Sequence, residues 1–192
     1  MMKTYKTISE PHVVAAINAG AVGVLPTDTV YGLACSVNNR DAVARLYALK
    51  HRHHKPGTII AASPDQLINL GIRKQNLSKV LRYWPGPVSV VVPDTRSLGY
   101  LDLGMQSLAV RVTDDKTLLA LLNQTGPLLT TSANLPGQPT ATSLDEAYRY
   151  FKESVDFYVD GGDYRGRPAS TLIRLVDGKI EVLRPGAVRV EP

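Results

Sequence analysis

A dense group of cationic side chains is the first part of the sequence that can do chemistry. Lysine, arginine and histidine fill the segment from Lys50 to Lys55, and Pro56-Gly57 follows at once. The apolar spacing from Asp41 onward predicts a helix that runs into this segment. Residues two apart on a continuous helix point to different sides, so Lys50 and Arg52 can face one ligand only if the helix ends near Lys50.

This group of cations has two interpretations. Cations at a helix C-terminus interact favourably with the helix dipole, which is a common surface arrangement. Cations beside a hydroxyl-rich turn are also what a phosphate-bearing ligand needs, and Thr27-Asp28-Thr29 supplies such a turn after an apolar run. On either interpretation, we expect the side chains of Lys50 and Arg52 to be exposed.

Three histidines, His51, His53 and His54, stand in the same segment and raise the question of a metal site. The lysines and arginine between them oppose the binding of another cation. We therefore predict no metal site and interpret the histidines as a solvated basic edge that is open to anions. The single cysteine, Cys35, follows an apolar run and is interpreted as a small core residue.

Hydroxyl and amide side chains form a second pattern at the end of a predicted strand. Thr130, Ser132 and Asn134 are spaced by two, so in an extended segment they share one face. Ligands of α/β proteins usually bind at strand ends. A plain turn is the alternative, because Ser and Asn are favoured in turns.

Two arginines complete the candidates. Arg111 is flanked by apolar residues in a predicted strand, and a buried cation requires a partner because unpaired burial is costly. The alternative is an arginine at a sheet edge whose side chain points to solvent, and the sequence favours neither interpretation over the other. Arg184 precedes Pro185-Gly186 at the end of a predicted hairpin, where a surface position is again the simplest interpretation.

Together these motifs resemble the YrdC/TsaC family of threonylcarbamoyl-adenylate synthases. The resemblance rests, in chain order, on Leu25–Gly32, Lys50-x-Arg52, Ser107–Val112, Thr131–Asn134, Ser170-Thr171 and Leu183–Gly186. Because these motifs span nearly the whole chain, the resemblance is far more specific than any one of them.

The resemblance implies that L-threonine, bicarbonate and ATP, which carries Mg²⁺, react to give threonylcarbamoyl-AMP and pyrophosphate. The carbamate formed on the threonine amine attacks the α-phosphate, so positive charge must meet the leaving pyrophosphate. Lys50 and Arg52 are therefore the predicted catalytic residues. The ATP contacts predicted by family position are Lys50, Arg52, Ser107, Thr130, Ser132, Asn134, Thr140 and Arg184. The threonine contacts predicted in the same way are Thr29, Arg111, which would hold the carboxylate, and Ser170, which would contact the hydroxyl.

The resemblance also implies partners, namely downstream proteins that transfer the threonylcarbamoyl group to tRNA. The alternative is a noncatalytic domain that binds double-stranded RNA or tRNA, which the net charge of +5 permits; weak RNA binding by an enzyme is also open. Two Phe and one Trp argue against an aromatic platform for bases. The carbamoyl-transfer module of hydrogenase maturation factors is excluded, because its zinc motifs need more than one cysteine.

Composition and patterning predict the fold class. With 44% apolar and 20% charged residues, the composition is that of a globular protein. Strand and helix patterns alternate and end in a hairpin, which predicts an α/β fold with a mixed sheet in one domain over residues 1–192. The resemblance adds that the sheet is twisted, has flanking helices and encloses a concave basic cavity. No membrane-length apolar run, secretory signal, G-x-x-x-x-G-K-[ST] or G-x-G-x-x-G motif is visible, so we expect a cytoplasmic protein without a membrane partner that binds ATP in an unrelated way.

The individual elements follow from the same patterns. Predicted helices run from a Ser9 cap to Gly20, from an Asn38 or Asn39 cap to about Lys50, from Ser63 to Leu70, from Asn76 to Trp84, from a Thr113 cap to Asn123, and from a Ser143–Glu146 capping box to Lys152. Predicted strands are Val22–Leu25, Thr58–Ala62, Val88–Val92, Leu108–Val112, Pro127–Thr131, Phe157–Val159, Thr171–Val176 and Lys179–Leu183, the last two turned at Asp177-Gly178. Asp94 to Gln106 is predicted as a surface connection, and Asp163 to Pro168 as either a surface loop or a mobile lid over the nucleotide.

Overall fold

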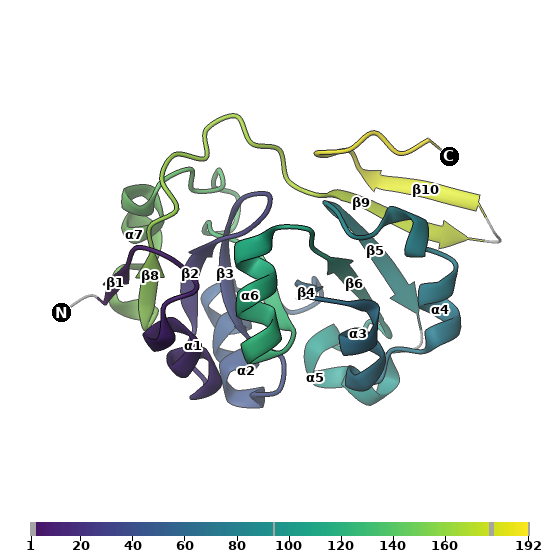
Figure 1. The fold of residues 1–192 in the computed structure, drawn as a ribbon, viewed down its shortest axis with the longest axis horizontal. Helices are drawn as coiled ribbons and strands as arrows, with labels where there is room; N and C mark the ends of the chain where they lie inside the picture. Colours follow the sequence, from purple (N-terminus) through teal and green to yellow (C-terminus); the bar gives the residue numbers. More distant parts are fainter. Residues whose placement is uncertain (1–2, 94, 177–178, 192) are drawn as a thin grey trace.

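A computed structural model describes residues 3–93, 95–176 and 179–191 of the chain. In these residues, one sheet of ten strands runs through the whole molecule in the order β1-β8-β2-β3-β7-β4-β6-β5-β9-β10 (Figure 1). The strands are β1 (Thr4–Tyr5), β2 (Gly23–Pro26), β3 (Tyr31–Ser36), β4 (Thr58–Ala61), β5 (Val88–Pro93), β6 (Ser107–Val112), β7 (Leu128–Ser132), β8 (Phe157–Val159), β9 (Thr171–Val176) and β10 (Lys179–Arg184). The predicted mixed α/β sheet with flanking helices is confirmed.

The sheet is mixed because it contains both parallel and antiparallel strand pairs. Parallel pairs are β1/β8, β2/β8, β4/β6 and β5/β9, whereas β2/β3, β3/β7, β4/β7, β5/β6 and β9/β10 are antiparallel. The central strand β7 thus has antiparallel neighbours on both sides, and its carboxyl end lies beside the start of β3 and of β4.

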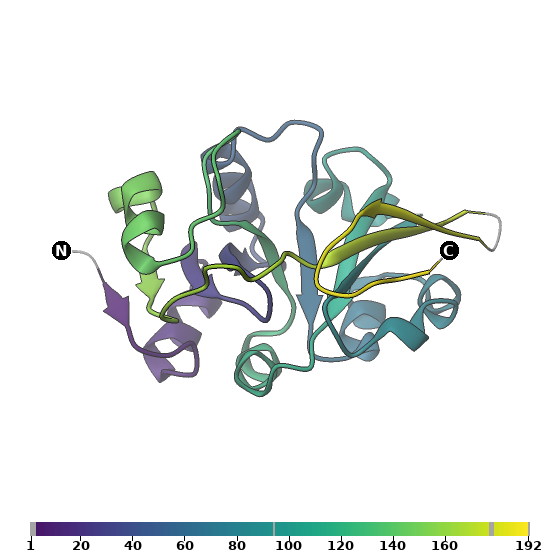
Figure 2. The ribbon, with the colours of Figure 1, turned by 90° about the horizontal axis from the view of Figure 1, so that it is seen from above.

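Helices cover both faces of the sheet, as the view from above shows (Figure 2). They are α1 (Pro11–Asn18), α2 (Arg40–Leu49), α3 (Pro64–Leu70), α4 (Lys74–Ser78), α5 (Gly99–Asp102), α6 (Lys116–Thr125) and α7 (Leu144–Phe151), with 3₁₀ turns η1 (Leu81–Tyr83), η2 (Arg96–Leu98) and η3 (Lys152–Ser154). One core cluster lies under α1 and α6, and the other under α2, α5 and α7. Residues of β3 alternate between the clusters: Leu33 and Cys35 enter one and Ala34 the other. None of the helices in the described residues is long and apolar enough to cross a membrane.

Several predicted caps are confirmed by their hydrogen bonds. The side chain of Asn39 accepts from Ala42 N at 2.9 Å at the start of α2. Ser63 caps α3 by accepting from Gln66 N at 3.3 Å. Ser143 likewise accepts from Glu146 N at the start of α7. The Glu146 carboxylate does not return to Ser143 N but accepts from Thr142 N at 2.8 Å.

Two predicted helix starts are wrong. Helix α6 is capped by Asp115, which accepts from Leu118 N at 2.8 Å, while the Thr113 hydroxyl, two residues before it, accepts from Asp115 N. Helix α1 has Glu10 at the N-cap position, and Ser9 does not cap it. The Glu10 carboxylate instead accepts from two preceding backbone amides and closes the turn that leads into the helix.

The other differences have local causes. Strands β1 and β3 are not predicted by the patterns above: β1 has two residues, and β3 is rich in small ones. The predicted helix from Asn76 to Trp84 divides into α4 and η1. The predicted surface connection contains α5, whose Leu101 and Asp102 are buried; Asp94 lies outside the described residues, as does the turn predicted at Asp177-Gly178.

Candidate active site

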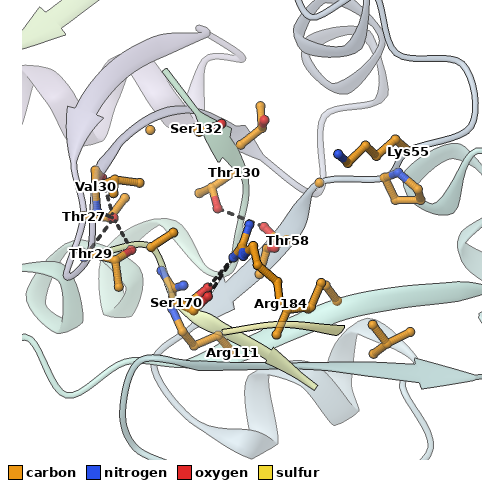
Figure 3. Close-up of a pocket in the computed structure, with 18 of the residues that line it drawn as sticks. Thr27, Thr29, Val30, Lys55, Thr58, Arg111, Thr130, Ser132, Ser170 and Arg184 are labelled. Atoms are coloured by element: carbon orange, nitrogen blue, oxygen red, sulfur yellow. Dashed lines mark hydrogen bonds between the residues drawn. The ribbon is translucent and has the colours of Figure 1, made fainter. Parts of the chain in front are cut away.

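A cavity of about 270 Å³ opens at the centre of the sheet, where strand ends and loops from distant parts of the chain meet (Figure 3). Most of the predicted site residues line it. They are Thr29, Arg52, Ser107, Arg111, Thr130, Ser132, Ser170 and Arg184. The sequence is thus right that these positions, up to 155 residues apart in the chain, come together.

The remaining three predicted residues lie elsewhere. Lys50 and Asn134 line an adjoining cavity of about 460 Å³, which shares Arg52, Lys55 and Ser132 with the central one. Thr140 lies half-buried in the loop after β7 and is not among the described residues that line either cavity.

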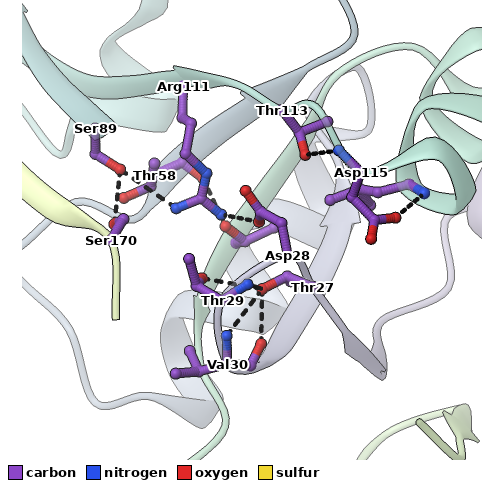
Figure 4. A network of polar contacts seen from close by, with 12 residues as sticks. Thr27, Asp28, Thr29, Val30, Thr58, Ser89, Arg111, Thr113, Asp115 and Ser170 are labelled. Atoms are coloured by element: carbon purple, nitrogen blue, oxygen red, sulfur yellow. Dashed lines mark hydrogen bonds and ion pairs between the residues drawn. The ribbon is translucent and has the colours of Figure 1, made fainter. Parts of the chain in front are cut away.

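One wall of the central cavity is the tight turn between β2 and β3. Thr27 Oγ1 donates to Val30 O at 2.7 Å and accepts from the amides of Thr29 and Val30 (Figure 4). It also lies 3.2 Å from Thr29 Oγ1. The hydroxyl-rich sequence therefore fixes its own backbone, and it holds Thr29 and Asp28 in set positions.

Behind this turn lies a buried ion pair. Arg111 Nη2 donates to Asp28 Oδ1 at 2.7 Å, and both side chains are at most 5% exposed. Burial lowers the pKa of Arg111, an effect that the Asp28 charge opposes. Burial likewise raises the pKa of Asp28 against the effect of Arg111. Of the two interpretations of Arg111, the buried and paired one is correct.

The ion pair continues into a chain of hydroxyl contacts. Arg111 Nη1 donates to Ser89 Oγ at 3.4 Å, and Ser89 Oγ lies 2.9 Å from Ser170 Oγ. On the far side, Arg184 Nη2 donates to Ser170 O at 2.7 Å and to Ser170 Oγ at 3.2 Å. Arg184 is exposed, as the surface interpretation expects, but it also lines the cavity, and its guanidinium connects the end of β10 to the residue before β9.

The opposite wall is formed by the segment after α2, which leaves the helix as predicted. His51 takes a left-handed conformation with φ of 49°. His51 N donates to Ala48 O and Arg52 N to Tyr47 O, both at 3.0 Å. This pair of bonds is a Schellman motif, which ends the helix and reverses the chain. The Arg52 guanidinium then donates to Lys55 O and Pro56 O at 3.2 and 3.1 Å.

The expected exposure of the two cations is wrong, because Lys50 is only 4% exposed and Arg52 is half-buried. Lys50 Nζ donates to Ser132 O at 2.9 Å, to Asn134 Oδ1 at 2.7 Å and to Asn134 O. The chain reversal at His51 directs this lysine inward, toward the carbonyls at the end of β7. Burial, followed by the charges of Arg52 and Lys55, lowers the pKa of Lys50 to about 8.

The polar row on β7 is shorter than predicted. Thr130 Oγ1 donates to Thr58 O at 3.0 Å, and Thr130 and Ser132 both line the central cavity. After Ser132 the chain turns, and Asn134 N donates to Ser132 O at 3.0 Å. Ser132 Oγ donates to Asn134 Oδ1 at 2.7 Å, so the two side chains and Lys50 form one hydrogen-bonded unit.

Two residues of this site have no role predicted from the sequence, although the residue type and position of each could have indicated one. Asp28 is the acid within the Thr27-Asp28-Thr29 motif, and an arginine inside a strand needs such a partner. Ser89 is the hydroxyl in the otherwise apolar run from Val88 to Val92, and it is fully buried. Among the described residues, no three His, Cys, Asp or Glu side chains are grouped so that they could hold a metal ion.

Comparison with known proteins relates this site to a family. The Sua5/YciO/YrdC family model, whose description is telomere recombination, matches residues 15–186. The threonylcarbamoyl-AMP synthase of Pseudomonas aeruginosa strain UCBPP-PA14 is 37% identical over 174 residues, which cover 88% of this chain and 92% of that protein. The threonylcarbamoyl-AMP synthase of Marinobacter nauticus is 36% identical and is matched over 84% of this chain and 88% of its own length.

Solved structures agree with these matches. The structure of P. abyssi Sua5 complexed with L-threonine superposes with a TM-score of 0.82 at 28% identity, covering 97% of this chain but 57% of that longer chain. The E. coli YciO structure superposes with a TM-score of 0.83 over 100% of this chain and 98% of its own, and at 24% identity it supports the fold alone.

Proposed function

The chain belongs to the Sua5/YciO/YrdC family, and on that premise we propose that it is an L-threonylcarbamoyladenylate synthase. It is a nucleotidyltransferase that forms threonylcarbamoyl-AMP and pyrophosphate from L-threonine, bicarbonate and ATP, for the threonylcarbamoyladenosine modification of tRNA. The observation that carries the proposal is the central cavity, in which an arginine suited to a carboxylate, Arg111, faces a wall with Arg52 and Lys55.

The threonine contacts are proposed for the side of the cavity that holds the ion pair. Arg111 meets the carboxylate, because a guanidinium donates to both oxygens of a planar anion. Ser170 and Thr29 meet the hydroxyl end of the amino acid. The Ser89–Ser170 and Thr27–Thr29 contacts fix those two hydroxyls in advance, which lowers the entropy cost of aligning the substrate.

The nucleotide is proposed for the wall with Arg52 and Lys55 and for the adjoining cavity. Arg52 lines both cavities and is placed to meet the phosphates of ATP and the leaving pyrophosphate. Lys50 lines the adjoining cavity together with Arg52, so its charge acts on phosphates bound there. Ser107, Thr130 and Arg184 supply further polar contacts from the central cavity. No protein nucleophile is required, because the carbamate of threonine attacks the α-phosphate itself.

Mg²⁺ is proposed to enter as part of the nucleotide. The described residues that line the two cavities include no carboxylate. Oxygen ligands for Mg²⁺ would therefore come from the phosphates and water, which is how this ion usually binds with ATP. The residues present fit a metal that the substrate carries.

Proteins that transfer the threonylcarbamoyl group to tRNA are the proposed downstream partners. The alternative of a noncatalytic RNA-binding domain has less support, because a structural neighbour holds L-threonine. In addition, Arg111 is buried and paired with Asp28, so it offers no exposed charge to an RNA backbone. Weak binding of RNA beside the catalytic function stays a proposal.

Pyrophosphate release by the purified protein tests the function. We expect release with ATP, L-threonine and bicarbonate together, and a threonylcarbamoyl-AMP product in mass spectra. Leaving out threonine or bicarbonate should abolish the release. Pyrophosphate formed at the same rate without threonine, or none at all under the full conditions, would refute the proposal.

A further inference from the structure

One buried tyrosine holds both ends of the segment that carries the basic side chains of the site. The backbone carbonyl of Tyr47 accepts from Lys50 N at 3.2 Å and from Arg52 N at 3.0 Å. Its hydroxyl accepts from Gly57 N at 3.2 Å and donates to Leu101 O. Segment 50–57 therefore begins and ends on the same residue of α2.

The tyrosine is rigidly placed for this task. Its side chain is 4% exposed within the core cluster beneath α2. Burial raises the pKa of Tyr47 to about 12, so the hydroxyl keeps its proton and can donate and accept at once. Loss of the hydroxyl would leave a buried amide and a buried carbonyl without this partner.

The far end of the segment has little freedom to move. A Cβ on Gly57 would lie 2.6 Å from Thr130 O and 2.9 Å from the side chain of Leu129. Gly57 is thus pressed against β7 on one side and tied to Tyr47 on the other. Thr58, the next residue, accepts from Thr130 and lines the central cavity (Figure 3).

The shape of the segment in turn sets the direction of its cations. Arg52 donates to the carbonyls of Lys55 and Pro56, so its guanidinium follows the backbone just before Gly57. A shift of Gly57 would move those carbonyls and the guanidinium with them. Displacements of about 1 Å at a reacting group are enough to cost catalysis.

We propose that Tyr47 is a positioning residue that fixes segment 50–57 so that Arg52 and Lys55 meet the phosphates of ATP and the pyrophosphate product. The inference rests on the proposed function and deepens it, since it assigns the polyphosphate side of the site to an element held by a side chain that touches no substrate. The threonine side is held separately, by the Asp28–Arg111 pair and by Ser89. The two halves of the site should therefore respond differently to a change at Tyr47.

The test is Tyr47→Phe, which removes the hydroxyl and keeps the ring in the core. We expect the KM for ATP and the calorimetric Kd for pyrophosphate to rise roughly three- to tenfold, the effect of about one lost hydrogen bond. The Kd for L-threonine should stay within about twofold. Unchanged ATP and pyrophosphate binding, or an equal loss of affinity for threonine, would overturn the proposal.

Two further variants separate positioning from loss of stability. Tyr158→Phe is the matched control, because Tyr158 is a buried tyrosine on β8 whose hydroxyl donates to Lys152 O at 2.6 Å and lines neither cavity. It should leave both substrate affinities unchanged. Gly57→Ala moves the same segment while Tyr47 stays intact, so it should reproduce the split between ATP and threonine even if Tyr47→Phe folds poorly; a Gly57→Ala variant without that split counts against the proposal.

The outcome also distinguishes the inference from the proposed function. A wild-type protein without threonine-dependent pyrophosphate release would refute the synthase, yet calorimetry with pyrophosphate alone still reports on the Tyr47 tether. Conversely, an active synthase whose Tyr47→Phe variant binds pyrophosphate like the wild type refutes the inference alone.

Discussion

A buried ion pair shapes the part of the site where the carboxylate of L-threonine is proposed to bind. Arg111 and Asp28 are paired at 2.7 Å and almost fully buried. Burial acts against the charge of each, so the pair is not primarily a source of stability. Its clearer effect is geometric, because Asp28 occupies Nη2 and Ser89 contacts Nη1, which fixes the plane of the guanidinium.

Replacement of Asp28 by asparagine tests this geometric role. We expect Asp28→Asn to raise the KM for L-threonine about tenfold or more, corresponding to about 1–3 kcal/mol, because the guanidinium loses its charged partner. The KM for ATP should change little. Glu181→Gln is the control, since it removes a carboxylate paired with Arg174 on the exposed β9–β10 hairpin. Equal effects on threonine and ATP would contradict the assignment.

Lys50 provides a pH-dependent test. Its folded pKa of about 8 lies below the ordinary value of 10.5, so between these values the unfolded chain binds more protons than the folded one. The stability contribution of this group is therefore full above pH 10.5 and is lost progressively as the pH falls from 10.5 to 8. Relative to Lys50→Met, the free energy of unfolding of the wild type should rise by up to about 3 kcal/mol between pH 8 and 10.5. Urea titrations of both proteins at several pH values would measure it, and parallel curves would show that Lys50 titrates normally.

At the scale of elements, the end of α2 determines where the basic segment goes. The Schellman motif places His51 at φ of 49°, a conformation that costs an L-residue with a Cβ about 1–2 kcal/mol. A β-branched side chain is less suited to it than histidine, and glycine is better suited.

Substitution of His51 should show this preference. His51→Val is expected to lower the free energy of unfolding by about 1–2 kcal/mol, whereas His51→Gly should not lower it. His53→Val is the matched control: His53 is an exposed histidine of the same segment whose φ is not positive, and its effect should stay within about 0.5 kcal/mol. Thermal unfolding of the three variants compares them directly, and a His51→Val protein as stable as His53→Val would contradict the assigned conformation.

The same region shows what a sequence can and cannot predict. The end of α2 is local information, because helical spacing stops where Pro56-Gly57 approaches, and its prediction is confirmed. The burial of Lys50 is not local, since it depends on carbonyls of Ser132 and Asn134 more than 80 residues away. Thr113 fails as a cap for a related reason: Asp115 competes for the same helix start, and only the backbone decides between them. The gathering of Arg111, Ser170 and Arg184 follows from the family resemblance, whereas periodicity alone does not show it.

At the scale of the whole molecule, the segment between β8 and β9 crosses most of the sheet. Strand β8 is second in the sheet and β9 is ninth, so residues 160–170 must cross from one side to the other, as Figure 1 shows along the top of the view. Tyr164 fastens this crossing. It is 8% exposed, its ring lies 4.8 Å from that of Tyr31, and its hydroxyl donates to Thr27 O at 3.1 Å in the turn that lines the cavity.

Tyr31, at the start of β3, holds the same segment in place. Its hydroxyl accepts from Gly161 N at 2.7 Å and donates to Gly162 O at 3.0 Å. Between these anchors and Ser170, the side chains of Arg165 and Arg167 are exposed; Arg165 is paired with Asp163, and Arg167 lies 3.9 Å from the centre of the Tyr164 ring. The segment is thus an exposed loop that is anchored by Tyr164. If it acts as a lid, it must move around this anchor; if it is only a surface loop, the anchor keeps it fixed.

Trypsin, which cleaves after Arg165, distinguishes these interpretations. Tyr164→Ala should lower the free energy of unfolding by about 3 kcal/mol, because it removes a buried aromatic side chain, and should speed cleavage after Arg165 about tenfold or more, because the anchor over Thr27 is lost. Tyr148→Ala, at a partly exposed tyrosine on α7, should leave this cleavage unchanged.

If the segment closes over the nucleotide, saturating ATP analogue and L-threonine together should slow cleavage of the wild type but not of Tyr164→Ala. Equal cleavage of the wild type with and without both substrates would leave the segment as a fixed connection between β8 and β9.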